Sequence, residues 1–323
     1  MLGETIARVS RIVPRRNIFV VTGEVLRGAV QRELPELRKD QILCEPTGRN
    51  TAACIAWAAL EIEKRDPEAV MLVLPADHVV APLGAYLADM QRGLAVANEE
   101  RCLVTFGISP THPETGYGYL RAGDAVGMPW PSASVRRVAA FHEKPNVAKA
   151  RRFLSGGFYW NSGMFAWRAD VIREELAAYL PKLAAGVAAL DRTRKRGGIP
   201  TKELLARYPR LEAISIDHGV MEKSRRVVMV IASFRWSDIG SWDAVGSLWP
   251  RDAHGNASRD PVLAIDSRNN VIATRAKPVA LVGVSGLAIV DAGDALLICS
   301  RQRAQDVRAV VSALDAAKLS RLR

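Results

Sequence analysis

Short apolar runs alternate with helix-period segments through the first 110 residues of this chain, and the alternation tightly limits the possible folds. The runs at 18–22, 42–44, 69–74 and 103–108 predict strands. The segments between them, at 25–33, 50–64 and 83–97, predict helices. This order is typical of parallel strands joined by crossover helices. The nearly unbroken apolar run at 70–74 favours a sheet that is covered on both faces.

The remainder of the chain has a different pattern. Strands are predicted at 135–143 and 158–167, among helices and turns. From about residue 260, five short runs punctuated by Gly, Asn and Asp predict a small all-β region, at 261–265, 270–274, 279–284, 287–290 and 295–299. Residues 302–322 have helical spacing. We therefore expect two domains, 1–255 and 256–323.

Composition bounds the function class. The 323 residues are 49% hydrophobic and 24% charged, which is ordinary for a soluble globular protein. The longest apolar runs are too short to span a membrane, and the start shows no signal-peptide pattern. Four scattered cysteines favour reduced thiols and a cytoplasmic location. The net charge of +11 could attract nucleic acid, but aromatic residues do not interleave with the basic ones. We expect no nucleic-acid or membrane partner.

Two aspartates follow candidate strands. Asp77 comes just after the run at 70–74, and Asp238 stands between Trp236 and Trp242. Aspartates at strand ends lie where open α/β sheets bind ligands, and two of them could share one Mg²⁺ ion. The alternative interpretation is a turn aspartate and a helix-capping aspartate, which is the commoner role of this residue.

Five further motifs combine glycines, prolines and polar residues near strand ends. Pro and Gly set a turn in 45–51 (Glu-Pro-Thr-Gly-Arg-Asn-Thr), and the glycines of 115–119 (Thr-Gly-Tyr-Gly-Tyr) allow a close backbone approach. An acid–base pair follows a strand in 141–145 (Phe-His-Glu-Lys-Pro). An amide and a hydroxyl occupy a turn in 160–165 (Trp-Asn-Ser-Gly-Met-Phe). Residues 216–223 (Ile-Asp-His-Gly-Val-Met-Glu-Lys) complete the series.

In order and content, these motifs resemble bacterial mannose-1-phosphate guanylyltransferases, also called GDP-mannose pyrophosphorylases, from about residue 2 to about 300. The resemblance implies an α/β fold with a Rossmann-like, glycosyltransferase-A-like mixed sheet flanked by helices. The nucleotidyltransferase domain would be followed by a small β-rich appendage and a terminal helix. The implied reaction converts GTP and mannose 1-phosphate into GDP-mannose and diphosphate. The C-terminal segment would pack on the catalytic domain and help to form a homodimer, or would simply cover a sheet edge.

The resemblance also implies roles for individual residues. Asp77 and Asp238 would hold Mg²⁺ between the sugar phosphate and the α-phosphate. Lys144 would offer a cation to the sugar phosphate, and Glu143 would accept from sugar hydroxyls. The hexose would also meet Gly118, Tyr119, Asn161 and Ser162, and the guanine and its ribose would meet Glu45, Gly48, Arg49 and Asn50.

Structural interpretations stay open for several of these residues. Glu143 and Lys144 could form a solvated ion pair. Asn161 and Ser162 could cap a turn. Arg49 could serve in a structural ion pair.

One departure from the family is large. The family's opening strand and its loop of the form Gly-Gly-x-Gly-x-Arg, which cradles the triphosphate, are not found in this sequence. The missing strand would lie between the strands at 18–22 and 69–74, so we expect a gap or a forced closure there. We also expect weak GTP binding, poor solubility and no measurable transferase activity. The competing hypotheses are an enzyme, a non-catalytic sugar-phosphate or nucleotide-binding regulatory protein, and an internal start within a longer enzyme.

Overall fold

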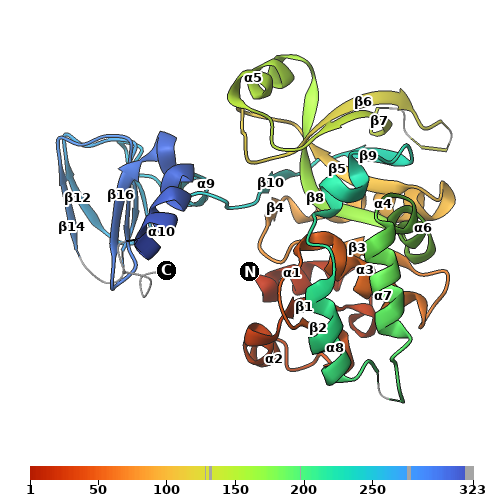
Figure 1. Ribbon diagram of the computed structural model, residues 1–323. Helices are drawn as coiled ribbons and strands as arrows, with labels where there is room; N and C mark the ends of the chain where they lie inside the picture. Colours follow the sequence, from red (N-terminus) through yellow and green to blue (C-terminus); the bar gives the residue numbers. More distant parts are fainter. Residues whose placement is uncertain (128, 131–132, 197, 275–277, 317–323) are drawn as a thin grey trace. The chain divides into compact units, whose positions relative to one another are not determined.

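The computed structural model describes residues 1–127, 129–130, 133–196, 198–274 and 278–316 (Figure 1). It divides into two compact units, Met1–Trp236 and Ser237–Arg323, each of which is described by itself. No helix in these described ranges is long and apolar enough to cross a membrane.

The first unit alternates helices and strands, as its sequence pattern predicts. Its strands are β1 (Val20–Gly23), β2 (Ile42–Glu45), β3 (Val70–Val73), β4 (Val79–Ala81), β5 (Leu103–Ile108), β6 (Tyr119–Ala125), β7 (Val135–His142), β8 (Phe158–Arg168), β9 (Val227–Ile231) and β10 (Arg235–Ser237). Its α-helices are α1 (Leu2–Val9), α2 (Arg27–Glu33), α3 (Asn50–Glu63), α4 (Leu83–Glu99), α5 (Val147–Ser155), α6 (Ala169–Tyr179), α7 (Pro181–Asp191) and α8 (Thr201–Arg207). Short 3-10 helices are η1 (Arg15–Asn17), η2 (Glu24–Leu26), η3 (Lys39–Gln41) and η4 (Tyr208–Arg210), and η5 (Asp217–Met221) is a π-helix.

A six-stranded mixed sheet in the order β3-β8-β5-β9-β7-β6 is the centre of this unit. β5 runs parallel to β9 and antiparallel to β8, which also pairs antiparallel with β3. Buried side chains of α3, α6 and α7 pack on one face of the sheet, and those of α4 pack on the other. All six residues of β5 are buried. The predicted α/β fold with helices on both faces of a mixed sheet is confirmed.

The sheet is interrupted beside β1. β1 and β2 pair in parallel with each other and form a separate two-stranded sheet. Among the described strands, none pairs with the other edge of β1 or with the outer edge of β3. Leu72 and Leu74 nevertheless pack against the cluster that contains Ile18 and Ile42. The predicted gap is therefore confirmed, and apolar side chains of both strands contribute to one core beside it.

The second unit is built from short strands. They are β11 (Ala257–Ser258), β12 (Val262–Ile265), β13 (Val271–Ala273), β14 (Val279–Val282), β15 (Leu287–Asp291) and β16 (Leu296–Ser300). β11, β13 and β15 form successive parallel pairs, as do β12 and β14. Beside these strands, the Asn270 amide donates to Asn256 Oδ1 and Val284 O, and Asn270 Oδ1 accepts from Leu287 N–H. These bonds satisfy backbone groups where the chain turns.

The predicted terminal helix begins later than expected. Residues 301–306 form the 3-10 helix η6 (Arg301–Asp306), which is kinked at Arg303, and α10 (Val307–Ala316) follows. The part of the prediction that covers 317–322 lies outside the described residues.

The compact units divide earlier than the expected boundary at 255/256. Helix α9 (Trp242–Ser247) packs on β13 and η6 of the second unit. A Cβ added at Gly246 would overlap the Val271 side chain, so helix and strand are in close contact there. Residues 237–255 therefore associate with the β-rich region.

Candidate functional site

Glycine 118 allows three segments to meet. A Cβ at this position would lie 2.6 Å from Glu143 Oε2 and 3.3 Å from the Asn161 Cβ. The Asn161 N–H donates to Gly118 O at 2.8 Å, which joins the residue before β6 to β8. Gly118, Glu143 and Asn161, which the sequence assigns to the hexose, therefore lie together at one end of the sheet.

A bulge in β8 carries the amide of this cluster. β8 pairs with β5 in register at Thr105–Phe165 and again at Gly107–Asn161, so extra residues stand between the two pairs. Gly163, inside the bulge, has a φ of +69°. β-Bulges redirect side chains and often lie beside functional sites. The sequence predicts a turn before the strand here, whereas the structure has a bulge within a continuous strand.

Glu143 and Lys144, the acid–base pair after β7, form an ion pair. Lys144 Nζ lies 3.0 Å from Glu143 Oε1; the Glu143 side chain is 8% exposed and that of Lys144 is 59% exposed. Lys144 has a φ of +45°, which is uncommon for a residue with a side chain and is often found at functional sites. The lysine thus presents its charge to solvent beside an enclosed carboxylate.

Two predicted hexose-contacting side chains are buried in the fold. Tyr119 is fully buried and its hydroxyl donates to Glu114 O. Ser162 is 1% exposed, and its hydroxyl accepts from Met164 N–H within the bulge. The Ser162 bond agrees with the local capping interpretation. The assignment of both residues to the hexose stays a prediction.

The residues predicted to bind the guanine and its ribose belong to the motif at 45–51, which begins at the last residue of β2. The Tyr208 hydroxyl donates to Glu45 Oε1 at 2.7 Å, and Tyr208 itself is fully buried against Trp57. Burial raises the pKa of Glu45, against the effect of hydrogen bonds from Tyr208 and the Arg49 backbone. Tyr208 is a residue that the sequence interpretation missed, because no local motif marks it.

The loop from Gly48 to Thr51 is tied to a distant segment. Arg49 Nε donates to Leu211 O at 2.7 Å, so this arginine has a structural bond. Thr51 Oγ1 accepts from Ile216 N–H, and Asn50 has a φ of +62°. Gly48 is exposed, with open space where a side chain would be. These bonds connect the loop to the segment that leads into η5.

The loop that carries Asp77 is held from two sides. Arg8 Nη2 donates to His78 O and Thr5 Oγ1 donates to Ala76 O, so α1 fixes the carbonyls on both sides of the aspartate. Trp236 Nε1 lies 3.0 Å from His78 Nδ1. The Asp77 carboxylate is exposed and has no hydrogen-bond or ion-pair partner within the described parts of the chain.

Asp238 follows directly after β10, at the start of the second unit. Its Oδ1 accepts from Gly240 N–H at 2.9 Å. Ile239 has a φ of +51°, a rare conformation for a β-branched residue. The expectation that Asp77 and Asp238 share a metal ion stays a prediction, because the positions of the two units relative to each other are not determined.

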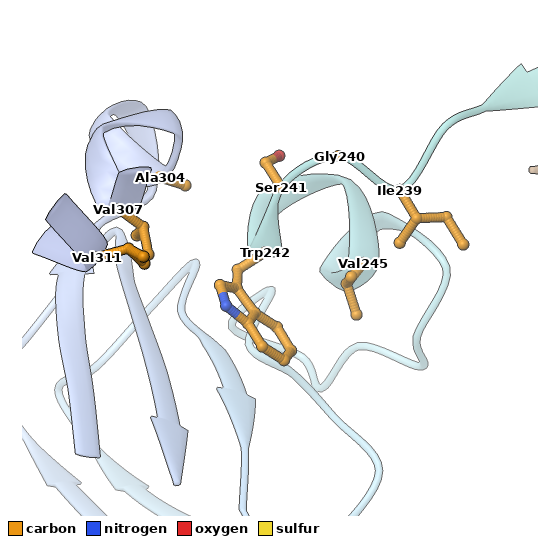
Figure 2. A pocket seen from close by; sticks show the side chains of 8 residues that line it. All are labelled: Ile239, Gly240, Ser241, Trp242, Val245, Ala304, Val307 and Val311. Carbon is orange, nitrogen blue, oxygen red and sulfur yellow. The ribbon is translucent and has the colours of Figure 1, made fainter. Parts of the chain in front are cut away.

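A pocket in the second unit lies beside this loop (Figure 2). It is bordered by α9 on one side and by η6 and α10 on the other. Its lining side chains come from Ile239, Ser241, Trp242, Val245, Ala304, Val307 and Val311, with Gly240. None of these side chains carries a charge, so the pocket lining supplies no ionic contact to a phosphate.

Two acidic residues of the π-helix region η5 contact the hexose cluster, the name used here for the residues Gly118, Glu143, Lys144 and Asn161, which are predicted to bind the hexose or its phosphate. Asp217 Oδ1 accepts from Asn161 Nδ2 at 2.8 Å, and Glu222, which follows the helix, accepts from Glu143 N–H at 2.9 Å. Withdrawal from solvent, reinforced by the charge of Glu143, raises the pKa of Asp217 to about 6. The motif at 216–223 was noticed in the sequence, but nothing in its spacing assigned these roles.

The residues present fit magnesium better than a transition metal. In the described ranges, no group of three or more His, Cys, Asp and Glu side chains is placed to hold a metal. Mg²⁺ needs only one or two carboxylates together with substrate phosphates. An exposed, unpartnered carboxylate such as Asp77 suits that requirement.

The fold and these motifs match known proteins. Residues 1–253 match the family described as nucleotidyl transferase, and residues 260–314 match the MannoseP isomerase/GMP-like beta-helix domain. The chain belongs to the nucleotidyl transferase family. The residues that match the β-helix domain lie within its second unit.

Similar proteins include a mannose-1-phosphate guanylyltransferase of Escherichia coli, 39% identical over 97% of this chain and 66% of the relative. The alginate biosynthesis protein AlgA of Pseudomonas aeruginosa is 38% identical over 88% of this chain and 59% of the relative. A crystal structure described as mannose-1-phosphate geranyltransferase from Thermus thermophilus superposes with a TM-score of 0.84 at 32% identity. It covers 97% of this chain and 89% of that one. The chain thus spans about three fifths to two thirds of the two sequence relatives.

Proposed function

We propose that this protein is a mannose-1-phosphate guanylyltransferase, which forms GDP-mannose for nucleotide-sugar and polysaccharide synthesis. An oxygen of mannose 1-phosphate would attack the α-phosphorus of GTP, and the bond from that phosphorus to the departing diphosphate would break. The carrying observation is the meeting of Gly118, Glu143, Lys144 and Asn161 in one cluster. The names of the relatives support the same assignment.

In this proposal the cluster binds the sugar phosphate. Lys144 supplies a mobile cation to the phosphate, while its neighbour Glu143 accepts hydrogen bonds from sugar hydroxyls. Asn161 adds an amide whose orientation is set by surrounding groups. Because the attacking oxygen already carries charge, the step needs positioning and charge neutralisation rather than a general base.

Glu45 is the proposed reader of guanine. Its carboxylate accepts from the Tyr208 hydroxyl and the Arg49 backbone, and its remaining lone pairs would accept from the guanine N1 or N2 donors. Adenine lacks that donor pattern and would leave polar groups unpaired. Gly48, Arg49 and Asn50 would line the ribose side of the same loop.

Mg²⁺, held by Asp77 and Asp238, would supply positive charge to the phosphates during the transfer. The protein's part is to fix the Asp77 loop through Arg8, Thr5 and His78. This fixation leaves the Asp77 carboxylate pointing away from any protein partner in the described structure.

A second function stays open because one observation favours it. Among the described strands, the edge of β1 away from β2 and the edge of β3 away from β8 have no partner, next to the expected triphosphate site. A protein with this sheet could bind sugar phosphate or nucleotide as a regulator without turning over.

Diphosphate release from GTP and mannose 1-phosphate with Mg²⁺ separates the two functions. Turnover that requires both substrates supports the enzyme. Binding of GDP-mannose without turnover supports the regulatory protein and agrees with the expected weakness of GTP binding. Absence of both turnover and binding would contradict both functions.

Two further assignments are proposals. Homodimer formation through the C-terminal unit is supported by apolar residues on the outward side of β12 and β14, namely Leu263, Ile265 and Val282. A cytoplasmic location is supported by four unpaired cysteines. The expectation of no nucleic-acid partner stays a prediction.

A further inference from the structure

The hexose cluster rests on an element whose function the sequence did not indicate. Helix η5 is a π-helix of five residues between the loop at 211–216 and β9. π-Helical turns are rare and are frequently found at functional sites. Gly219 permits this turn to lie close to the end of α6, because a Cβ there would lie 2.7 Å from the Leu180 side chain.

We infer that η5 and the residue after it form a support for the proposed hexose-phosphate site, with Asp217 and Glu222 as positioning residues. Asp217 fixes the side-chain amide of Asn161, and Glu222 fixes the backbone at Glu143. This inference rests on the proposed function, because it assigns a role to groups that surround the proposed sugar ligands.

The orientation of the Asn161 amide follows from three partners, of which Gly163 N–H makes a long bond of 3.4 Å to Oδ1. Thr105 Oγ1 donates to Asn161 Oδ1 at 2.8 Å, and Asn161 Nδ2 donates to Asp217 Oδ1 at 2.8 Å. An ionised carboxylate can only accept, so it selects the nitrogen end of the amide. Asn161 Nδ2 keeps a second N–H, which is available to a sugar oxygen. Without Asp217 the Nδ2 end loses its acceptor, and only Thr105, whose hydroxyl can accept as well as donate, and the long bond from Gly163 N–H hold the amide.

Glu222 acts on the turn that carries the acid–base pair. Its Oε1 accepts from Glu143 N–H, and its Oε2 lies 3.0 Å from His218 Nδ1. Lys144, the next residue, holds an unfavourable left-handed backbone conformation. The hydrogen bond from Glu143 N–H to Glu222 offsets part of the free-energy cost of this backbone conformation. Glu222 therefore helps to hold Lys144 in its observed backbone conformation.

The test compares GDP-mannose affinity with GDP affinity by calorimetry, using the full chain with Mg²⁺. The affinity for GDP measures binding at the proposed guanine and ribose contacts without the hexose. We expect Asp217→Ala and Glu222→Ala to weaken GDP-mannose binding by about tenfold or more, because each leaves a donor unpaired. GDP affinity should change by less than about twofold, because GDP lacks the hexose that the cluster binds. Asp217→Asn and Glu222→Gln keep an acceptor of similar shape, so they should lose less than the alanine variants.

Glu212→Gln is the matched control, because Glu212 is an exposed carboxylate on the segment that leads into η5. It should leave both affinities unchanged. Equal losses of GDP and GDP-mannose affinity in the alanine variants would show a general structural role and overturn the inference. The inference would also be overturned if the unsubstituted chain bound GDP-mannose and the alanine variants bound it with the same affinity. Failure of the unsubstituted chain to bind GDP-mannose would instead overturn the proposed function, and this inference with it.

Discussion

Lys144 and Asp217 come from distant parts of the sequence and lie close together in the candidate site, but they differ in their exposure to solvent. Lys144 is directed to solvent from a strained backbone, whereas Asp217 is withdrawn beside Glu143 and Asn161. The sequence predicted the lysine, because an acid–base pair before a proline stands out. It did not assign Asp217, because a half-buried carboxylate is recognised as part of a site only when its surroundings are known.

Lys144→Ala removes the cation from the proposed phosphate contact. We expect affinity for mannose 1-phosphate to fall by about tenfold, because a charge-assisted bond is lost. Calorimetry measures the change. Lys149→Ala, which removes an exposed lysine from α5, is the control and should have no effect. Unchanged sugar-phosphate affinity in Lys144→Ala would show that the lysine has another role.

Asp217 predicts a pH-dependent stability. Its pKa is about 6 in the folded protein and 3.8 for the unperturbed group, so folding favours the protonated form. Its contribution to the free energy of unfolding is complete below pH 3.8 and is lost as the pH rises through about 6. Asp217→Asn should therefore raise stability at pH 7, by on the order of 2 kcal/mol or less. Urea unfolding at about pH 7 and about pH 4 measures this, on either side of the folded pKa. The gain should vanish at the lower pH, and a gain that is equal at both values would contradict the assignment.

The same titration changes binding, since protonated Asp217 no longer acts only as an acceptor. Glu143, Lys144, Glu222 and His218 surround this end of η5 and also contribute charge. GDP-mannose is a suitable probe, because its diphosphate diester does not titrate near the pKa of Asp217. We expect its affinity to fall between about pH 7 and about pH 5 in the unsubstituted chain, and to fall less in Asp217→Asn. Identical pH profiles would exclude Asp217 as the titrating group.

Among the elements, β5 and the interruption between β1 and β3 were both predicted, but on different grounds. β5 agrees with its prediction residue for residue, because its mostly apolar run ends at Ser109 and Pro110. The interruption was predicted because the resembled family's opening strand is not found in this sequence. The insertion of β8 between β3 and β5, with its bulge, was not predicted, because an antiparallel partner from distant sequence leaves no local pattern. The burial of Tyr119 and Ser162 was not predicted for a related reason: their motifs show residue types but not side-chain directions.

The unpaired edge of β1 predicts unequal hydrogen exchange. In a parallel strand, alternate residues direct their N–H groups to opposite neighbours. About half of the β1 amides should therefore exchange rapidly, whereas those of β5, which pairs on both sides, should be protected. Exchange followed by NMR measures both strands in one sample. Protection of β1 equal to that of β5 would mean that its second edge is paired.

For the whole molecule, the outward face of β12 and β14 predicts self-association. Leu263 and Val282 are each 67% exposed on that face. Apolar groups of this kind are commonly covered by a partner. The double change Leu263→Arg with Val282→Arg should convert a dimer into a monomer in light scattering. Leu205→Arg, a change at an exposed leucine of α8, should not. A monomeric unsubstituted chain would contradict the proposal.

The assignment of the whole chain to GDP-mannose chemistry depends on both ends of the first unit, with Glu45 for guanine and the Lys144 cluster for the sugar phosphate. GDP-mannose tests both at once, and it avoids the triphosphate, whose expected site lies beside the interrupted sheet. The decisive measurement is calorimetric binding of GDP-mannose against ADP-mannose to the full chain with Mg²⁺. We expect saturable GDP-mannose binding at least about tenfold tighter than that of ADP-mannose, and weaker binding when Mg²⁺ is removed. Equal affinity for the two nucleotide sugars, or binding of neither, would contradict the assignment.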